Sequence, residues 1–230
     1  MAGKPIIFSG PMVRALLDGR KTQTRRILKP QPWNPEREKD PDFDGWQSHH
    51  AFEVKARQGI LRSTHGIGTR LWVREKFSGL HRLESYPPSQ WLAAQVDTYD
   101  GLEIEEAAPI WYWADGNPKQ GDWTRPRPSI HMPRWASRLT LTVTDVRVQR
   151  LAAITLGDVA AEGIEGAREL LDRAAISRGE AVPFGKFRDL WNSLHGPDAW
   201  EANPWVVALT FDVHRHNIDA LPARLTEGGA

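Results

Sequence analysis

Cysteine is absent from this chain of 230 residues, which excludes disulfide bonds, thiolate nucleophiles and cysteine-based zinc sites. An excess of either charge is also absent. Lysine and arginine number 30 and aspartate and glutamate 29, so the formal net charge of +1 creates no global field that draws the chain to nucleic acid. No apolar run approaches the length of a membrane span, and the N-terminus lacks the apolar core of a secretory signal. We therefore expect a cytoplasmic protein.

Motifs for several common kinds of chemistry are missing too. The sequence has no P-loop, no G-x-G-x-x-G motif, no heptad pattern and no internal repeat. Its eight histidines are scattered, without the spacing of a metal site. We expect neither a metal nor another cofactor.

Tryptophan, by contrast, is abundant, with 11 in the chain. A tryptophan buries a large apolar area and often keeps its N–H for a polar partner. Most of these residues should lie in the core or anchor long loops. A few could form a surface on which a base stacks, or an interface for self-association.

Hydrophobic periodicity and turn residues predict an α+β fold, with short strands first, then a group of helices, then a last strand. Strands are expected at residues 4–9, 22–28, 69–77, 109–114, 138–149 and 203–213. Helices are expected at residues 11–17, 154–163, 167–178 and 184–195, the second of them capped by Thr155. A hairpin could form within residues 46–63 and a short helix within 89–95.

We predict a single domain over residues 1–215. Loops rich in proline or without periodicity mark insertions near residues 30–68 and 78–108. The polar residues 216–230 should form a flexible tail.

The stretch from Gly19 to Arg26 carries the most informative pattern. Gly19 can end a short helix in the left-handed conformation, and the threonine-rich residues after it predict a strand. On that strand Thr22, Thr24 and Arg26 would share a face, with Lys21 at the start of the strand. An amine, a hydroxyl and a guanidinium would then lie close together. Composition alone supports another interpretation. Basic residues at a helix end are usually solvated, and threonines in a strand usually reflect β-propensity.

The pattern Gly19-x-Lys21-x-x-Thr24-x-Arg26 resembles the G-x-K-x-x-T-x-R signature of the ASCH domain family, a branch of the PUA-like superfamily. Four further blocks resemble ASCH-like proteins of phages and prophages, and they occur in the expected order over most of the chain. They are residues 5–12, 70–75, 127–138 and 203–206. The resemblance implies a PUA-like small β-barrel with helices packed around its rim, in the cytoplasm of a bacterial or phage-infected bacterial cell.

The resemblance also implies a catalytic set. In the ASCH-like amidohydrolase that removes the acyl group from N4-acetylcytidine, a lysine, a threonine and a glutamate do the chemistry, and Lys21, Thr24 and Glu75 match them. Thr24 would be the nucleophile, Lys21 its base, and Glu75 the donor or relay of a proton to the leaving amine. Burial and the charge of Arg26 would lower the pKa of Lys21.

Without the resemblance, Glu75 would be interpreted as a surface carboxylate paired with Arg74 or Lys76. Residues expected to bind the substrate are Arg25, Arg26, Ser129, His131 and Arg138. Arg26, or backbone N–H groups, would stabilise the oxyanion. A lone histidine ahead of a strand is more often structural, and the same alternative applies to Ser129 and Arg138.

The expected partner is a modified nucleoside, or a single modified base of a nucleic acid, and hydrolysis of an N-acyl bond is the leading hypothesis. A binding module is the first alternative: Lys21, Arg25 and Arg26 would contact phosphate, and tryptophans would stack a base. A ribonuclease and an accessory role in phage assembly are the others. The near-zero net charge favours recognition of a small molecule or single base over an extended basic groove.

Overall fold

The computed structural model describes residues 3–29, 31, 54–55, 65–91, 110–172 and 181–222. The described residues group into two compact units. Unit 1 is drawn from Met1–Arg14, Arg70–Leu141 and His214–Ala230, and unit 2 from Ala15–Thr69 and Thr142–Val213. This grouping does not test the single domain expected over residues 1–215, which stays a prediction.

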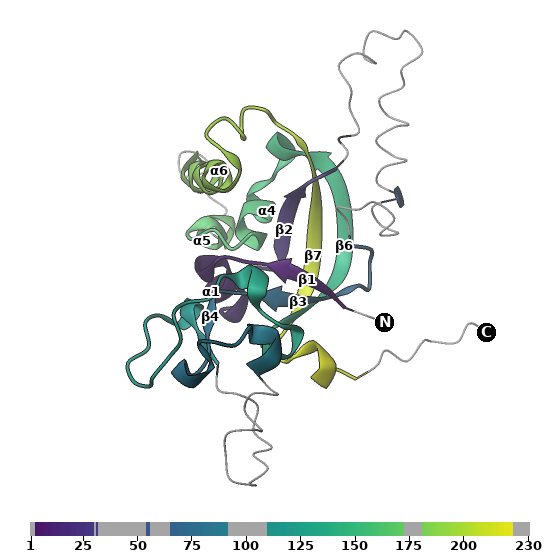
Figure 1. Ribbon diagram of the computed structural model, residues 1–230. Coiled ribbons are helices and arrows are strands. Elements are labelled where there is room, and N and C mark those ends of the chain that lie inside the picture. The colour runs from purple at the N-terminus through teal and green to yellow at the C-terminus, as the bar shows by residue number, and fades with distance from the viewer. Residues whose placement is uncertain are drawn as a thin grey trace, which may run out of the picture. The chain divides into compact units, whose positions relative to one another are not determined.

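The predicted mixture of helices and strands is confirmed (Figure 1). The strands are β1 (Lys4–Ile7), β2 (Gln23–Ile27), β3 (Arg70–Arg74), β4 (Phe77–Ser78), β5 (Trp111–Tyr112), β6 (Thr140–Arg150) and β7 (Trp205–His214). The α-helices are α1 (Gly10–Leu17), α4 (Leu156–Ala161), α5 (Ala167–Asp172) and α6 (Ala181–His195). None of the helices in the described ranges has both the length and the apolar character needed to cross a membrane.

Five of the strands form a mixed sheet in the order β1-β3-β6-β7-β2. β1 runs parallel to β3, and β2 runs antiparallel to β7 with Thr24 opposite Leu209. Closure into a barrel would require β1 and β2, the two ends of this order, to pair with each other. The described strands therefore form an open sheet and not the closed barrel that we predicted. β4 and β5 pair separately.

The core of unit 2 joins its helices to the sheet. Val159 of α4, Phe187 and Trp191 of α6 and Val206 of β7 are buried in one apolar cluster. Phe187 and Trp191 are four residues apart, so they lie on the same face of α6. In Figure 1, α4, α5 and α6 lie together beside β2 and β7. This packing fixes α4 next to the strand that carries Thr24.

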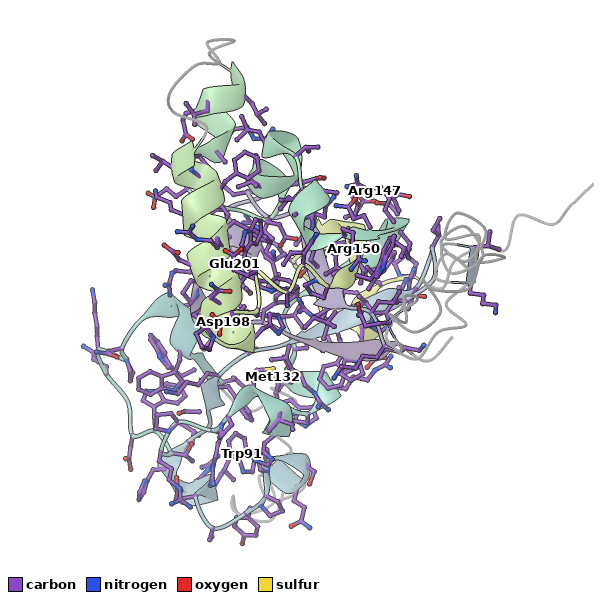
Figure 2. The ribbon with its side chains drawn as sticks, turned by 90° about the horizontal axis from the view of Figure 1, so that it is seen from above. Trp91, Met132, Arg147, Arg150, Asp198 and Glu201 are labelled. Carbon is purple, nitrogen blue, oxygen red and sulfur yellow. The ribbon has the colours of Figure 1, made fainter. Side chains whose placement is uncertain are left out.

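Unit 1 has its own apolar cluster, which includes Trp91 and Met132, both labelled in Figure 2. The rings of Trp91 and Phe77 meet edge to face, with centroids 5.5 Å apart. A Cβ added at Gly79 would lie 2.5 Å from the Trp91 ring, so only glycine leaves room for this packing. Trp91 thus has the core role that we expected for most tryptophans.

Several bounds differ from the predictions. The strand predicted at residues 69–77 is divided, because β3 ends at Arg74 and β4 begins at Phe77. The strand predicted at 109–114 is limited to β5 and is followed by a 3₁₀ turn at Trp113–Asp115. The predicted hairpin within 46–63, apart from residues 54–55, and residues 92–108 of the second insertion lie outside the described residues.

Regular structure continues past residue 216, where we expected the tail to begin. A 3₁₀ helix, η8 (Ile218–Ala220), buries Ile218. The Asn217 side chain caps this helix and donates hydrogen bonds to three backbone carbonyls, including that of Ser137 at 2.7 Å. Residues 223–230 lie outside the described residues.

Candidate functional site

A tight turn after α1 places Lys21 beside the end of α4. Gly19 has φ +72°, which confirms the predicted left-handed cap. The backbone N–H of Lys21 donates to the carbonyl of Ala15 at 2.9 Å, and that of Thr22 donates to the carbonyl of Ala161 at 2.8 Å. These bonds align Lys21 with Glu162, and the two residues form an isolated antiparallel bridge.

The Lys21 side chain is buried against Glu162. Its Nζ donates to the Glu162 carboxylate oxygen Oε2 at 2.7 Å and to the Glu162 backbone carbonyl at 3.0 Å. Burial lowers the pKa of Lys21, the Glu162 carboxylate opposes this change, and the charges of Arg26 and Arg25 add to it. Both predicted causes of the lower pKa, burial and Arg26, therefore contribute, whereas the opposing carboxylate was not predicted.

Arg25 belongs to the same buried network. Its Nη1 donates to Oε1 of Gln23 at 2.6 Å and to Oε1 of Glu162 at 3.0 Å. Its Nη2 lies 3.0 Å from Oδ2 of Asp158. Lys21, Arg25, Asp158 and Glu162, here called the lysine network, are all buried. Water solvates these charges little, so their mutual pairing has to offset the cost of desolvation.

Asp158 enters the network from the first turn of α4. Thr155 is the N-cap, as predicted: its hydroxyl accepts the Asp158 N–H, and the Asp158 carboxylate accepts the Thr155 N–H, both at 3.1 Å. Arg147 of β6, labelled in Figure 2, donates to Oδ1 of Asp158 at 2.6 Å. Burial favours a higher pKa for Asp158, but the bonds from Arg147 and Thr155 and the charge of Arg25 lower it.

Thr24 is buried on β2, and its hydroxyl is engaged by Arg26. The hydroxyl oxygen accepts a hydrogen bond from Nη1 of Arg26 at 2.7 Å, and the same nitrogen donates to the Arg25 carbonyl at 2.9 Å. Thr24 and Arg26 are two residues apart on a strand and share a face, as predicted. Burial lowers the pKa of Arg26, against the charge of Glu162. A guanidinium in this position favours negative charge on the threonine oxygen.

Glu75 lies in unit 1, where Arg138 holds it by two parallel hydrogen bonds. Arg138 donates from Nε to Oε1 of Glu75 at 2.9 Å and from Nη2 to Oε2 at 3.0 Å. Glu75 is 1% exposed, so it is not the surface carboxylate of the alternative interpretation. Burial raises the pKa of Glu75, Arg138 opposes this, and Asp115 adds to it.

Arg138 is shared with a second carboxylate. It donates to both oxygens of Asp115, at 2.7 and 2.8 Å, and its guanidinium carbon lies 4.1 Å from the centre of the Tyr112 ring. Burial alone would lower the pKa of Arg138, but the bonds to Asp115 and Glu75 raise it. Burial and the Glu75 charge raise the pKa of Tyr112 to about 12. The guanidinium expected to bind substrate is therefore engaged with two carboxylates of the chain.

Ser129 and His131 lie in unit 1, at the two ends of a 3₁₀ helix, Ser129–His131. The His131 side chain is exposed and Ser129 is half-buried. Between them, the carbonyl of Ile130 accepts a hydrogen bond from Arg74 at 3.1 Å. The role of Ser129 and His131 in substrate binding stays a prediction.

The structure thus assembles two sets of the predicted residues. In unit 2 it joins Lys21 to Arg25 through Glu162, and Thr24 to Arg26. In unit 1 it joins Glu75 to Arg138. In the described part of the chain, no group of three or more His, Cys, Asp or Glu side chains could hold a metal ion.

Sequence reasoning missed three carboxylates, Glu162, Asp158 and Asp115. Glu162 is 141 residues from Lys21 in the sequence, so no local pattern relates the two. The one available signal was the general rule that a buried lysine needs a carboxylate partner.

Comparison of the chain with models of protein families, with curated proteins and with solved structures gave no match. The ASCH resemblance therefore stays a prediction that rests on the sequence blocks.

Proposed function

We propose that this is an ASCH-type protein that hydrolyses the N-acyl bond of a modified nucleobase or nucleoside such as N4-acylcytidine, with Lys21, Thr24 and Glu75 as catalytic residues. A PUA-like fold is part of this proposal. The observation that carries it is the buried hydroxyl of Thr24, hydrogen-bonded to Arg26 at 2.7 Å, three residues after a buried lysine whose pKa is lowered.

The first chemical step is attack of the Thr24 Oγ1 on the acyl carbon. A threonine hydroxyl is a weak nucleophile until a base removes its proton, and neutral Lys21 would accept that proton. Burial and the charges of Arg25 and Arg26 favour the neutral amine. Arg26 would stabilise the negative charge that develops on the attacking oxygen and on the acyl oxygen.

The bond between the acyl carbon and the nitrogen then breaks, and the acyl group stays on Thr24 as an ester. The leaving amine needs a proton, and Glu75 is the proposed donor or relay. Its raised pKa supports this role, because a carboxyl group that keeps its proton at higher pH can donate it. Water then adds to the acyl carbon, the bond to the Thr24 oxygen breaks, and the Thr24 hydroxyl and a free carboxylic acid are formed. Lys21 releases its proton to solvent and Glu75 takes one up, so both return to their starting states.

A module that binds modified nucleic acid without cleaving it is the second candidate function. The observation that favours it is the positive charge around Arg26. Burial, followed by the charges of Arg26 and Lys29, lowers the pKa of His195, so the positive charges of these two side chains act on the histidine. Such a group could contact phosphate.

Hydrolysis of N4-acetylcytidine by wild type and by Thr24→Val tests the proposal. The matched control is Thr22→Val, because Thr22 is half-buried on the same stretch and its backbone makes the bonds to Ala161 and Phe211. We expect Thr24→Val to lower kcat/KM by about 10³-fold or more, since it removes the nucleophile, and the control to stay within about threefold. Glu75→Gln should lower kcat if Glu75 supplies the proton.

Absence of turnover by folded wild type on N4-acylated cytosine nucleosides would overturn the hydrolase proposal, and so would wild-type activity in Thr24→Val. Binding of a modified oligonucleotide separates the second candidate. Affinity that falls in Arg26→Gln, in a protein without turnover, would favour the binding module.

A further inference from the structure

We propose that Glu162 is a positioning residue for Lys21: it holds the amine in one orientation and stabilises its protonated form. The consequence for catalysis rests on the proposed function, whereas the interaction itself can be measured in the free protein.

Glu162 offers the Lys21 amine two acceptors from a single residue. The carboxylate oxygen Oε2 lies 2.7 Å and the backbone carbonyl oxygen 3.0 Å from Nζ. A neutral amine has two N–H groups, so the same two acceptors can hold it before and after it takes up a proton. The direction of the remaining position on the nitrogen is then fixed in both states.

Glu162 is itself held firmly. Its backbone N–H donates to the carbonyl of Asp158 at 2.8 Å, in the last turn of α4. Its second carboxylate oxygen, Oε1, accepts from Arg25 at 3.0 Å. The carboxylate is 5% exposed, so its charge acts on Lys21 with little screening by water. A fixed, buried carboxylate can therefore orient the amine as well as influence its charge.

The charged groups around Lys21 act in opposite directions. Arg25 and Arg26, both on β2, disfavour the ammonium, and Glu162, at the end of α4, favours it. Asp158, on α4, pairs with Arg25 at 3.0 Å and with Arg147 at 2.6 Å. Glu162 is thus a carboxylate in direct contact with Lys21, so removal of its charge should lower the pKa of Lys21.

This balance sets the strength of Lys21 as a base. When Lys21 takes the proton of Thr24, the Glu162 carboxylate stabilises the ammonium that forms, so the proton transfer becomes more favourable. Glu162→Gln should make the free amine more abundant at lower pH and weaker as a base. The acid limb of the kcat profile should move to lower pH, and the plateau value of kcat should fall.

The decisive experiment is an NMR titration of the Lys21 side chain in wild type and Glu162→Gln, with the signal assigned from Lys21→Arg. We expect the titration midpoint of Lys21 to fall by about one pH unit or more in Glu162→Gln, because an adjacent opposite charge is lost. The matched control is Glu165→Gln, which removes the same charge from an exposed position three residues away and should leave the midpoint unchanged.

The direction in which the titration midpoint of Lys21 moves separates a positioning role of Glu162 from simple structural support. If Glu162→Gln merely loosened the site, water would solvate Lys21 and the midpoint would rise toward that of an ordinary lysine. A rise, or no change, would overturn the proposal. Should Glu162→Gln fail to fold, Glu162→Asp retracts the carboxylate, and the midpoint should fall by a smaller amount. An unchanged or higher midpoint in that variant would overturn the proposal equally.

The titration also separates this inference from the proposed function. A lower midpoint in a protein that hydrolyses no N-acylcytosine would support Glu162 as the residue that positions Lys21 and reject the hydrolase. Hydrolysis by wild type with an unchanged midpoint in Glu162→Gln would support the hydrolase and reject the role of Glu162.

Discussion

Each unit contains a group of paired charges around a predicted catalytic residue, and these two groups differ in their access to water. The lysine network of unit 2 is buried throughout, with Lys21 1% and Glu162 5% exposed. The Glu75 cluster of unit 1, defined as Glu75, Arg138 and Asp115, runs from a buried carboxylate to one that is 42% exposed. Burial is complete in the first group and graded in the second.

The same desolvation acts on opposite chemical groups in the two units. It favours the neutral amine of Lys21 and the neutral carboxyl of Glu75, since burial disfavours the charged form of either. A neutral amine is a base and a neutral carboxyl is an acid, so burial alone moves each residue toward the role proposed for it. The nearest partners, Glu162 and Arg138, oppose this change in both cases.

The largest expected effect comes from breaking the buried pair. Glu162→Ala leaves Lys21 and Arg25 without this carboxylate in a buried site, and it should lower the free energy of unfolding by about 3–5 kcal/mol. Asp115→Ala removes a partly exposed partner of Arg138 and should cost about 1 kcal/mol or less. Urea unfolding curves measure both. Equal costs would contradict the difference in burial between the two groups.

Two glycines in unit 2 test the close packing at Lys21. Gly163 and Gly166 have φ +83° and +85°, so an alanine at either is strained. An added Cβ at Gly163 would also lie 3.0 Å from the Cβ atoms of Ala15 and Lys21, whereas nothing lies within 4 Å at Gly166. We expect Gly166→Ala to cost about 1–2 kcal/mol from strain alone and Gly163→Ala to cost more. Thermal unfolding that ranks them in the reverse order would argue against tight packing at Lys21.

Asp158→Asn should change the pH dependence of stability. The pKa of Asp158 is lowered in the folded protein, so its carboxylate stabilises the fold above the pKa of the unfolded chain, and this stabilisation is lost as pH falls through the folded pKa. The variant should be less stable than wild type at neutral pH, and the difference should shrink on acidification. Chemical unfolding at several pH values measures it. A difference in stability between wild type and variant that grows on acidification would contradict a lowered pKa of Asp158 in the folded protein.

The smallest effect concerns Tyr112. Its pKa is raised to about 12 by burial first and by the Glu75 charge second. Glu75→Gln removes the second cause, so the phenol should titrate at lower pH while burial keeps it above an ordinary tyrosine. Phenolate absorbance measures the titration, and Tyr112→Phe identifies the signal among the three tyrosines of the chain. An unchanged midpoint would mean that Glu75 is not charged when Tyr112 titrates.

Local features of the fold were predictable because neighbouring residues determine them. The left-handed turn at Gly19 and the cap at Thr155 follow from residue type and position alone. The sharing of one strand face by Thr24 and Arg26 follows from the two-residue period of a strand. The prediction of a closed barrel was wrong because closure depends on pairing between distant strands, which hydrophobic periodicity does not specify.

Partners distant in the sequence were not predictable either. Lys21 and Thr24 could be proposed from a motif, but Glu162 could not, because the bridge between Lys21 and Glu162 exists only after α4 packs beside β2. The same holds for Asp115, which meets Arg138 through a turn after β5. Charge pairs are specified by the tertiary fold, so sequence patterns identify one member of a pair and leave the other unknown.

Rapid-quench mass spectrometry of the protein mixed with N4-acetylcytidine is the most direct test of the proposed chemistry. The mechanism requires a transient acetyl ester on the Thr24 hydroxyl. We predict a peptide that contains acetylated Thr24 in wild type and in Thr22→Val, and no such peptide in Thr24→Val. Release of free cytidine without acetylation of Thr24 at any time point would contradict the nucleophilic role of Thr24 and, with it, the proposed mechanism.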